Sequence, residues 1–265
     1  MTQTNADDEQ TPDDVFRTAV AVEAGLGALA LILGYLLGPS ARELVPPLNE
    51  VASSAVIGGI GLGIVATIPL VLFVAVLRRI KHPAIEELDK LSDHPMIGLM
   101  LRLNAWELFA ISLCAGVGEE LLFRGWLLPW LAGDAASLAP DLEAPSRWWA
   151  YGGWLGSLPN SVTEFAWPDE GLMAWWSRVG GWELTAAWLV SSFAFGMFHP
   201  ITKLYIVVTA LMGLYFGALL IVTGNLLIPI TAHALYDAVQ LWGAGRAAED
   251  TEEDVTDEVE KSDQS

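Results

Sequence analysis

The sequence predicts an all-α polytopic membrane protein with about six transmembrane helices and a tryptophan-rich insertion outside the membrane. Its 265 residues are 53% hydrophobic and only 17% charged, with a mean hydropathy of +0.44, which is too apolar for a soluble domain of this length. Residues 54–77 contain no charged side chain and would form about 36 Å of helix, enough to cross the hydrocarbon core of a bilayer. The lipid bilayer is therefore an expected partner of this chain.

Six apolar segments are long enough to be considered as spans. In order along the chain they are residues 18–38, 54–77, 104–131, 183–199, 202–223 and 226–243. Gly224 and Asn225 are the turn signal that separates the last two. We expect two N-terminal spans and an inner loop over residues 18–103, and a membrane core over residues 104–243.

The two ends of the chain are acidic. Most of the formal net charge of −19 lies in residues 1–17 and 244–265, which are also poor in apolar side chains. Both segments are predicted to be disordered tails. Acidic termini also argue against a nucleic acid as partner, because binding to phosphates requires basic side chains.

A long connection at residues 133–182 interrupts the core. It holds seven of the 12 tryptophans of the chain, namely Trp148, Trp149, Trp154, Trp167, Trp175, Trp176 and Trp182. Tryptophan prefers the headgroup level of a bilayer, which favours an insertion that lies on the outer leaflet. A lid over a substrate entrance is the alternative, and the sequence does not separate the two.

Basic residues in the short loops predict the orientation. With the N-terminus inside, most Lys and Arg residues fall on the inner side, and only Arg42, Arg147 and Arg178 fall outside. We therefore expect a multi-pass protein of the cell membrane with both termini in the cytoplasm.

The third apolar segment contains three charged residues in the stretch GVGEELLFRG, at positions 116–125. Glu120 and Arg124 are four residues apart with the acid first, which is the favourable order for an ion pair on one helix face. Glu119 points about 100° away from that face and has no local partner. An uncompensated carboxylate in a membrane segment costs several kcal/mol, roughly, so Glu119 is a candidate for function.

Two further apolar segments carry polar groups. His199 ends SSFAFGMFHP, and His233 lies in IPITAHALYDAV with Asp237 one turn later on the same face. Each histidine alone is most simply a hydrogen-bonded structural residue. Together with Glu119, however, they are the parts of a hydrolase that activates water, or alternatively the ligands of a metal ion.

Three patterns occur in order on successive apolar segments: EExxxR at Glu119, Glu120 and Arg124, FxxxH at Phe195 and His199, and HxxxD at His233 and Asp237. Over about residues 104–243 they resemble the CAAX prenyl protease and bacteriocin-processing family, also called Abi. The resemblance implies a helical membrane endopeptidase that uses glutamate and histidine without an obligatory metal or other cofactor. It also implies a membrane protein or peptide as substrate.

The resemblance assigns a role to each matching position. Glu119 and His199 would activate the attacking water, while His233 and Asp237 would face the oxyanion. Glu120, Arg124 and Phe195 would be structural support. The eukaryotic prenyl-protein members have Asn where this chain has Asp237; an ionised Asp cannot donate a hydrogen bond, so it must be protonated or instead orient His233.

Two alternatives remain open from the sequence. In the first, Glu119, His199 and His233 are ligands of Zn²⁺ in a metal-dependent membrane protease. In the second, the protein is a non-enzymatic immunity or transport factor whose buried polar residues only hold helices together. The motifs HExxH, GxGD and GxSG of other membrane protease classes are absent from the sequence.

Overall fold

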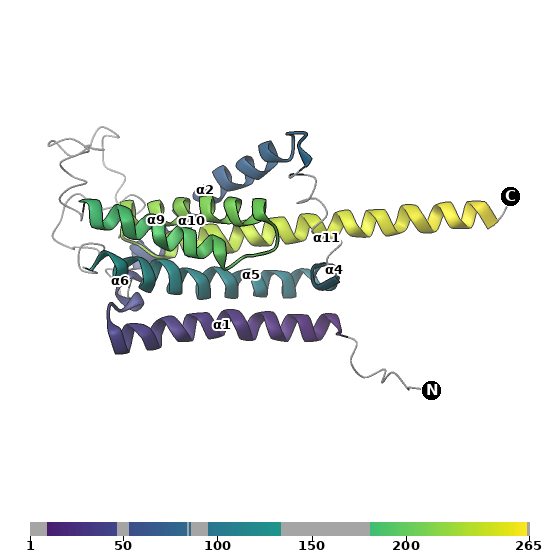
Figure 1. The fold of residues 1–265 in the computed structure, drawn as a ribbon. Helices are drawn as coiled ribbons and strands as arrows, with labels where there is room; N and C mark the ends of the chain where they lie inside the picture. The colour runs from purple at the N-terminus through teal and green to yellow at the C-terminus, as the bar shows by residue number, and fades with distance from the viewer. Residues whose placement is uncertain (1–9, 47–52, 84, 86–94, 134–180, 264–265) are drawn as a thin grey trace, which may run out of the picture.

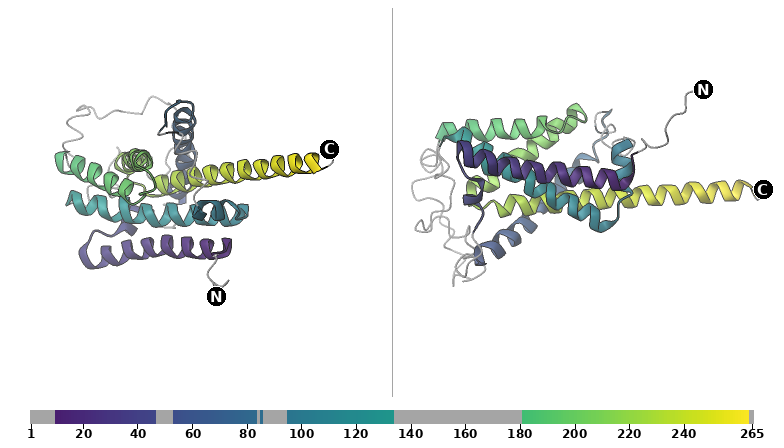
Figure 2. Two further views of the ribbon diagram at one scale, coloured as in Figure 1. Left: turned by 45° about the vertical axis from the view of Figure 1, so that its right-hand side comes forward. Right: turned by 90° about the horizontal axis from the view of Figure 1, so that it is seen from below.

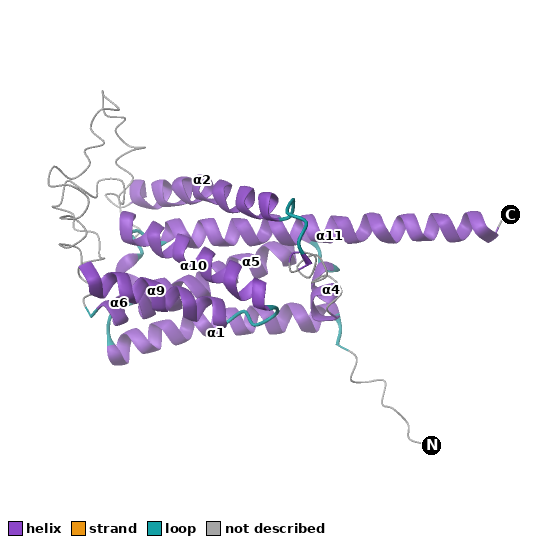
Figure 3. Ribbon diagram, turned by 45° about the horizontal axis from the view of Figure 1, so that its top comes forward, coloured by secondary structure: helices purple, strands orange, loops and turns teal. Residues whose placement is uncertain are grey.

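The computed structural model describes residues 10–46, 53–83, 85, 95–133 and 181–263, and within these ranges the regular structure is entirely helical (Figures 1 and 3). The predicted all-α class is therefore confirmed. The helices, in order, are α1 (Pro12–Leu37), η1 (Ala41–Leu44), α2 (Ser53–Leu77), α4 (Pro95–Leu101), α5 (Ala105–Glu120), η3 (Leu121–Leu127), α6 (Leu128–Ala132), α9 (Gly181–Met197), α10 (Lys203–Thr223) and α11 (Leu227–Asp263). The expected insertion at 133–182 falls almost wholly outside the described residues.

Three helices of the described part of the chain are long and apolar enough to cross a membrane. They are α1, residues Ala55–Leu77 of α2, and α10. The other three expected spans correspond to the continuous helical segment of α5, η3 and α6, to the 17-residue α9, and to the first part of α11. The protein is thus a polytopic membrane protein, and the number of six spans stays a prediction.

The helices approach one another closely at glycines. A Cβ atom at Gly63 of α2 would lie 2.8 Å from the carbonyl oxygen of Ile228 in α11, and one at Gly116 of α5 would lie 2.9 Å from the backbone nitrogen of Ala234. Small residues at such contacts allow helix backbones to meet, which is the usual way in which membrane helices gain packing energy. In this way α11 is held between α2 and α5.

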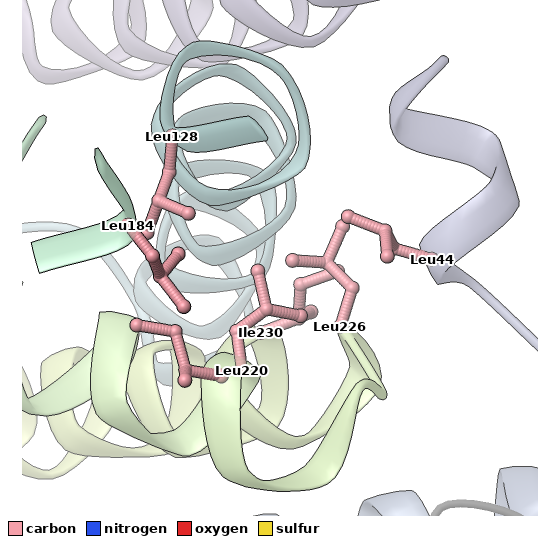
Figure 4. Close-up of a cluster of buried hydrophobic side chains, with 7 residues drawn as sticks. Leu44, Leu128, Leu184, Leu220, Leu226 and Ile230 are labelled. Atoms are coloured by element: carbon pink, nitrogen blue, oxygen red, sulfur yellow. The ribbon is translucent and has the colours of Figure 1, made fainter. Parts of the chain in front are cut away.

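The start of α11 is fixed by a turn and by a leucine-rich cluster. Gly224 ends α10 with a φ of 65°, a left-handed conformation that glycine adopts without strain. The next residue, Asn225, donates from its side chain to the carbonyl of Ala55 at 3.1 Å, and the Leu226 N–H donates to the carbonyl of Leu44 at 2.9 Å. Figure 4 shows the buried cluster beside this turn, formed by Leu44, Leu128, Leu184, Leu220, Leu226 and Ile230.

Both ends of the described chain differ from the expected disordered tails. Helix α1 begins at Pro12, where Thr11 and Asp14 form a reciprocal capping box, so residues 12–17 are helical. Helix α11 continues to Asp263, well past residue 243, and extends beyond the bundle in Figures 1 and 2. The start of α1 and the far end of α11 lie at the same end of the bundle (Figure 1).

Candidate active site

The two adjacent glutamates lie at the point where α5 passes into the π-helical turn η3. Asn104 caps the start of α5, because its side chain accepts hydrogen bonds from the N–H groups of Trp106 and Glu107. At the other end of α5, Glu119 and Glu120 are buried, and Arg124 in η3 is also buried. π-helical turns inside α-helices are frequent at functional sites.

Glu120 joins two elements through a single oxygen. Its Oε1 atom accepts a hydrogen bond from Nη1 of Arg124 at 2.9 Å and lies 2.9 Å from Nδ1 of His233 in α11. The guanidinium of Arg124 also lies over the rings of Phe195 and Phe216, with its Cζ atom 4.0 and 5.3 Å from the ring centroids. The contact with His233 and the aromatic rings beside the guanidinium thus stabilise the buried Glu120–Arg124 pair.

His199 follows the end of α9 and is held by the helix that precedes it. Its Nδ1 atom lies 2.9 Å from the carbonyl oxygen of Phe195. Because a carbonyl only accepts hydrogen bonds, Nδ1 carries a hydrogen and Nε2 is the ring nitrogen that faces the other groups of the site. That Nε2 atom lies 3.5 Å from Oε1 of Glu119.

His233 is oriented in the same manner from α11. The bond between Nδ1 and Glu120 turns Nε2 toward the other groups, at 3.9 Å from Oε2 of Glu119 and 3.3 Å from Oδ2 of Asp237. The ring of Phe216 stacks on the imidazole at a centroid distance of 4.9 Å and an angle of 16°. The contact with Glu120 and the stacked ring of Phe216 therefore fix the position and the orientation of the His233 imidazole.

The structure brings the four residues predicted to be catalytic into one site, where Glu119 lies between the Nε2 atoms of His199 and His233 and Asp237 adjoins the latter. The side chains of Glu119 and His233 are nearly inaccessible, whereas 22% of that of His199 and 29% of that of Asp237 are exposed. The accessible part of the site is therefore formed by the side chains of His199 and Asp237. Chemically, a buried carboxylate between two imidazoles can accept a proton from water.

The residues predicted to be structural have larger roles than the sequence indicates. Glu120 was expected to neutralise Arg124 alone, but it also holds His233. Phe195 supplies both the carbonyl that binds His199 and a ring beneath Arg124. Phe216, which the sequence did not single out, carries no signal beyond lying on an apolar helix.

The depth of His199 is compatible with the site although its helix is short. From the sequence, His199 lies at the inner end of its span and Glu119 near the middle of another, so tilts or shifted boundaries are required for them to meet. In the structure α9 ends at Met197, two residues before His199, and Pro200 follows. Proline cannot continue the helix, and the chain turns at this level beside the carboxylate of Glu119.

Metal binding was the alternative use of the same residues. Across the described residues, no group of three or more His, Cys, Asp or Glu side chains is arranged to hold a metal ion. The histidines nevertheless have the orientation of metal ligands, because each directs Nδ1 to an oxygen acceptor and Nε2 to the centre.

The described residues form an all-helical membrane bundle that holds a buried glutamate between two oriented histidines. The family model described as type II CAAX prenyl endopeptidase Rce1-like matches residues 101–239, just over half of the chain. The chain belongs to this family, which is described as one of endopeptidases. No curated protein and no solved structure matches the chain.

Proposed function

We propose that the protein is an intramembrane endopeptidase in which Glu119 and His199 activate a water molecule for hydrolysis of a peptide bond. The observation that carries this proposal is the position of Glu119, 3.5 Å from Nε2 of His199 and 3.9 Å from Nε2 of His233. Because other acceptors hold both Nδ1 atoms, the two Nε2 atoms and the carboxylate are the groups left to act on substrate. No metal or other cofactor takes part in this proposal.

The first step is the attack of water on the carbonyl carbon of the substrate. A water molecule hydrogen-bonded to Glu119 loses a proton to the carboxylate as its oxygen attacks, and Nε2 of His199 orients the same water. Burial of Glu119 supports this role, since a base in an apolar environment keeps its orientation and is not solvated by bulk water.

The developing oxyanion is assigned to His233 and Asp237. Nε2 of His233 donates to the oxyanion when it carries a proton, and the contact with Glu120 supports that form by placing a carboxylate behind the ring. Glu120 already occupies Nδ1, so Asp237 is not required to select the tautomer of His233. Asp237 is then left to face the oxyanion.

We infer that the substrate is a membrane protein or membrane-bound peptide, hydrolysed at the cell membrane by a multi-pass enzyme with both termini in the cytoplasm. The family description names prenylated CAAX sequences, which makes a farnesylated CAAX peptide the first probe. No part of the described surface argues for a nucleic acid as substrate, because the chain is strongly acidic.

The proposal is tested with purified protein in liposomes and a fluorogenic farnesylated CAAX peptide. Wild-type protein should cleave the peptide, and His199→Ala should reduce kcat by about a hundredfold or more, as expected for loss of an acid–base group. His82→Ala, a change at an exposed histidine, is the matched control and should leave the rate unchanged. Full activity in folded His199→Ala would contradict the mechanism.

The natural substrate requires a separate measurement. Membrane and secreted peptides from cells that carry wild-type protein are compared with those from cells that carry Glu119→Ala. Fragments present only with the wild type identify the cleaved bonds, and equal peptide sets in the two cell lines would contradict an endopeptidase function under those conditions.

A further inference from the structure

A further acidic residue packs beside the active site from outside the region that matches the family. Glu23 lies in α1, and the match begins at residue 101. Helix α1 packs against α5 at two glycines: a Cβ atom at Gly118 would collide with the carbonyl oxygen of Glu23, and one at Gly27 would lie 3.5 Å from Cα of Gly118. The backbone of Glu23 therefore touches α5 directly before Glu119.

The side chain of Glu23 is directed toward the same centre. Its charge interacts with Glu119 on α5, with His199 after α9, and with His233 and Asp237 on α11; of these four groups, Glu119 acts most strongly. Oε2 of Glu23 is buried, so this part of the carboxyl group faces the interior of the bundle.

One oxygen of this carboxyl group makes no hydrogen bond to the described residues. Oε2 of Glu23 is fully buried and has no hydrogen-bond partner among the described residues. Oε2 of Glu119, Oε2 of Glu120 and Nη2 of Arg124 share this state, so such atoms gather in this site although the loss of hydration on burial is normally compensated by a hydrogen bond. An ionised, unpartnered carboxylate beside the carboxylate of Glu119 is strongly disfavoured, which leaves Glu23 as the neutral acid with a hydrogen to donate.

We propose that Glu23 is the general acid that protonates the nitrogen of the leaving peptide. This inference rests on the proposed function, which assigns the proton of the attacking water to Glu119. Amide nitrogen leaves as an amine and not as an anion, so the reaction requires a proton donor that can reach this nitrogen.

The proton balance closes between the two glutamates. Water attacks the carbonyl carbon and gives one proton to Glu119; the C–N bond then breaks, its electron pair remains on nitrogen, and Glu23 gives that nitrogen a proton. The products are a carboxylic acid and an amine, with Glu119 protonated and Glu23 ionised. Transfer of one proton from Glu119 to Glu23 then restores the starting state.

The experiment compares two substrates that share one acyl fragment. The first is the farnesylated peptide with its scissile amide, and the second is the p-nitrophenyl ester of the same acyl fragment, whose phenolate leaves without a proton. Glu23→Gln should lower the amide rate by about a hundredfold or more and leave the ester rate within about twofold of the wild type. The exposed Glu43→Gln is the control and should change neither rate.

Each result of the two assays either supports or overturns the general-acid role of Glu23. An amide rate that Glu23→Gln leaves unchanged, or equal losses on both substrates, would overturn the general-acid role. If Glu23→Gln fails to fold, the ratio of amide to ester rates in Glu23→Asp decides, because a shorter acid should lower that ratio and an unchanged ratio contradicts the proposal. Wild-type protein that cleaves neither substrate would instead contradict the proposed function itself.

Discussion

Replacing Arg124 by alanine should destabilise the protein strongly, because the change leaves a buried carboxylate without its cation. Arg124 is 1% exposed and Glu120 is 0% exposed, and their charged atoms are 2.9 Å apart. Breaking a buried ion pair from one side typically costs about 3–5 kcal/mol. The contact of Nδ1 of His233 with Glu120 survives the substitution and places the expected loss near the lower end of that range, at about 3 kcal/mol.

A loss of this size corresponds to more than about a hundredfold in the ratio of folded to unfolded protein. The assay is unfolding in mixed detergent micelles with increasing dodecyl sulfate, followed by circular dichroism. Arg102→Ala, at an exposed arginine, is the control and should change the unfolding free energy by less than about 0.5 kcal/mol.

The double variant Glu120→Gln with Arg124→Ala, compared with each of these single changes, sharpens the test. It removes both charges together, so its destabilisation should be smaller than the sum of the two single changes by about 1–3 kcal/mol. Additive single effects, or an Arg124→Ala variant as stable as the wild type, would refute the reasoning that the pair is buried and coupled.

Three further predictions follow from the site and the packing. Asp237→Asn should keep hydrolysis within about threefold of the wild type, since Glu120 and not Asp237 holds Nδ1 of His233; a folded variant that is inactive at every pH would contradict this. Chelation with a strong zinc ligand should leave the rate unchanged, and loss of activity that Zn²⁺ restores would instead support the metal-dependent alternative. Gly116→Val should separate α5 from α11 and cost about 1–3 kcal/mol, whereas Gly25→Ala, with no atom within 4 Å of the added carbon, should cost nothing; equal stability of the two variants would contradict the close packing.

The sequence predicts those features of the site that depend on spacing within one helix. The Glu120–Arg124 pair follows from a separation of four residues, and the structure has the two side chains in contact at 2.9 Å. The shared face of His233 and Asp237 follows in the same way. The helical class follows from long apolar segments, because a backbone in lipid must satisfy its hydrogen bonds internally.

Contacts between helices do not follow from spacing within one helix, because they depend on the rotation and height of each helix in the bundle. The contact of Glu120 with His233 joins residues 113 positions apart, and no short pattern encodes it. Glu23 was visible only as one acidic residue in an apolar segment, which is also compatible with a helix end at the membrane surface. Its position beside Gly118 results from a glycine contact that the sequence of α1 alone does not reveal.

The acidic C-terminal segment shows where composition misleads. High charge and few apolar residues indicate disorder over 244–265, but α11 continues through Asp263. The segment also contains strong helix formers such as Ala and Glu, and it extends a helix that is already nucleated. Propagation from an existing helix requires no new nucleus, which the compositional argument does not consider.

The central claim is that Glu119 is the base of a hydrolytic reaction, and the most direct test is the turnover of Glu119→Gln in liposomes. The substitution preserves size and removes the ability to accept a proton, so kcat on the farnesylated peptide should fall by about a hundredfold or more. The unfolding free energy should stay within about 1 kcal/mol of the wild type, and exposed Glu43→Gln should retain full activity. Turnover of Glu119→Gln at the wild-type rate would contradict the account. A wild-type protein without peptidase activity, together with a Glu119→Gln variant that fails to fold, would also contradict it and would favour a non-enzymatic role for the buried polar residues.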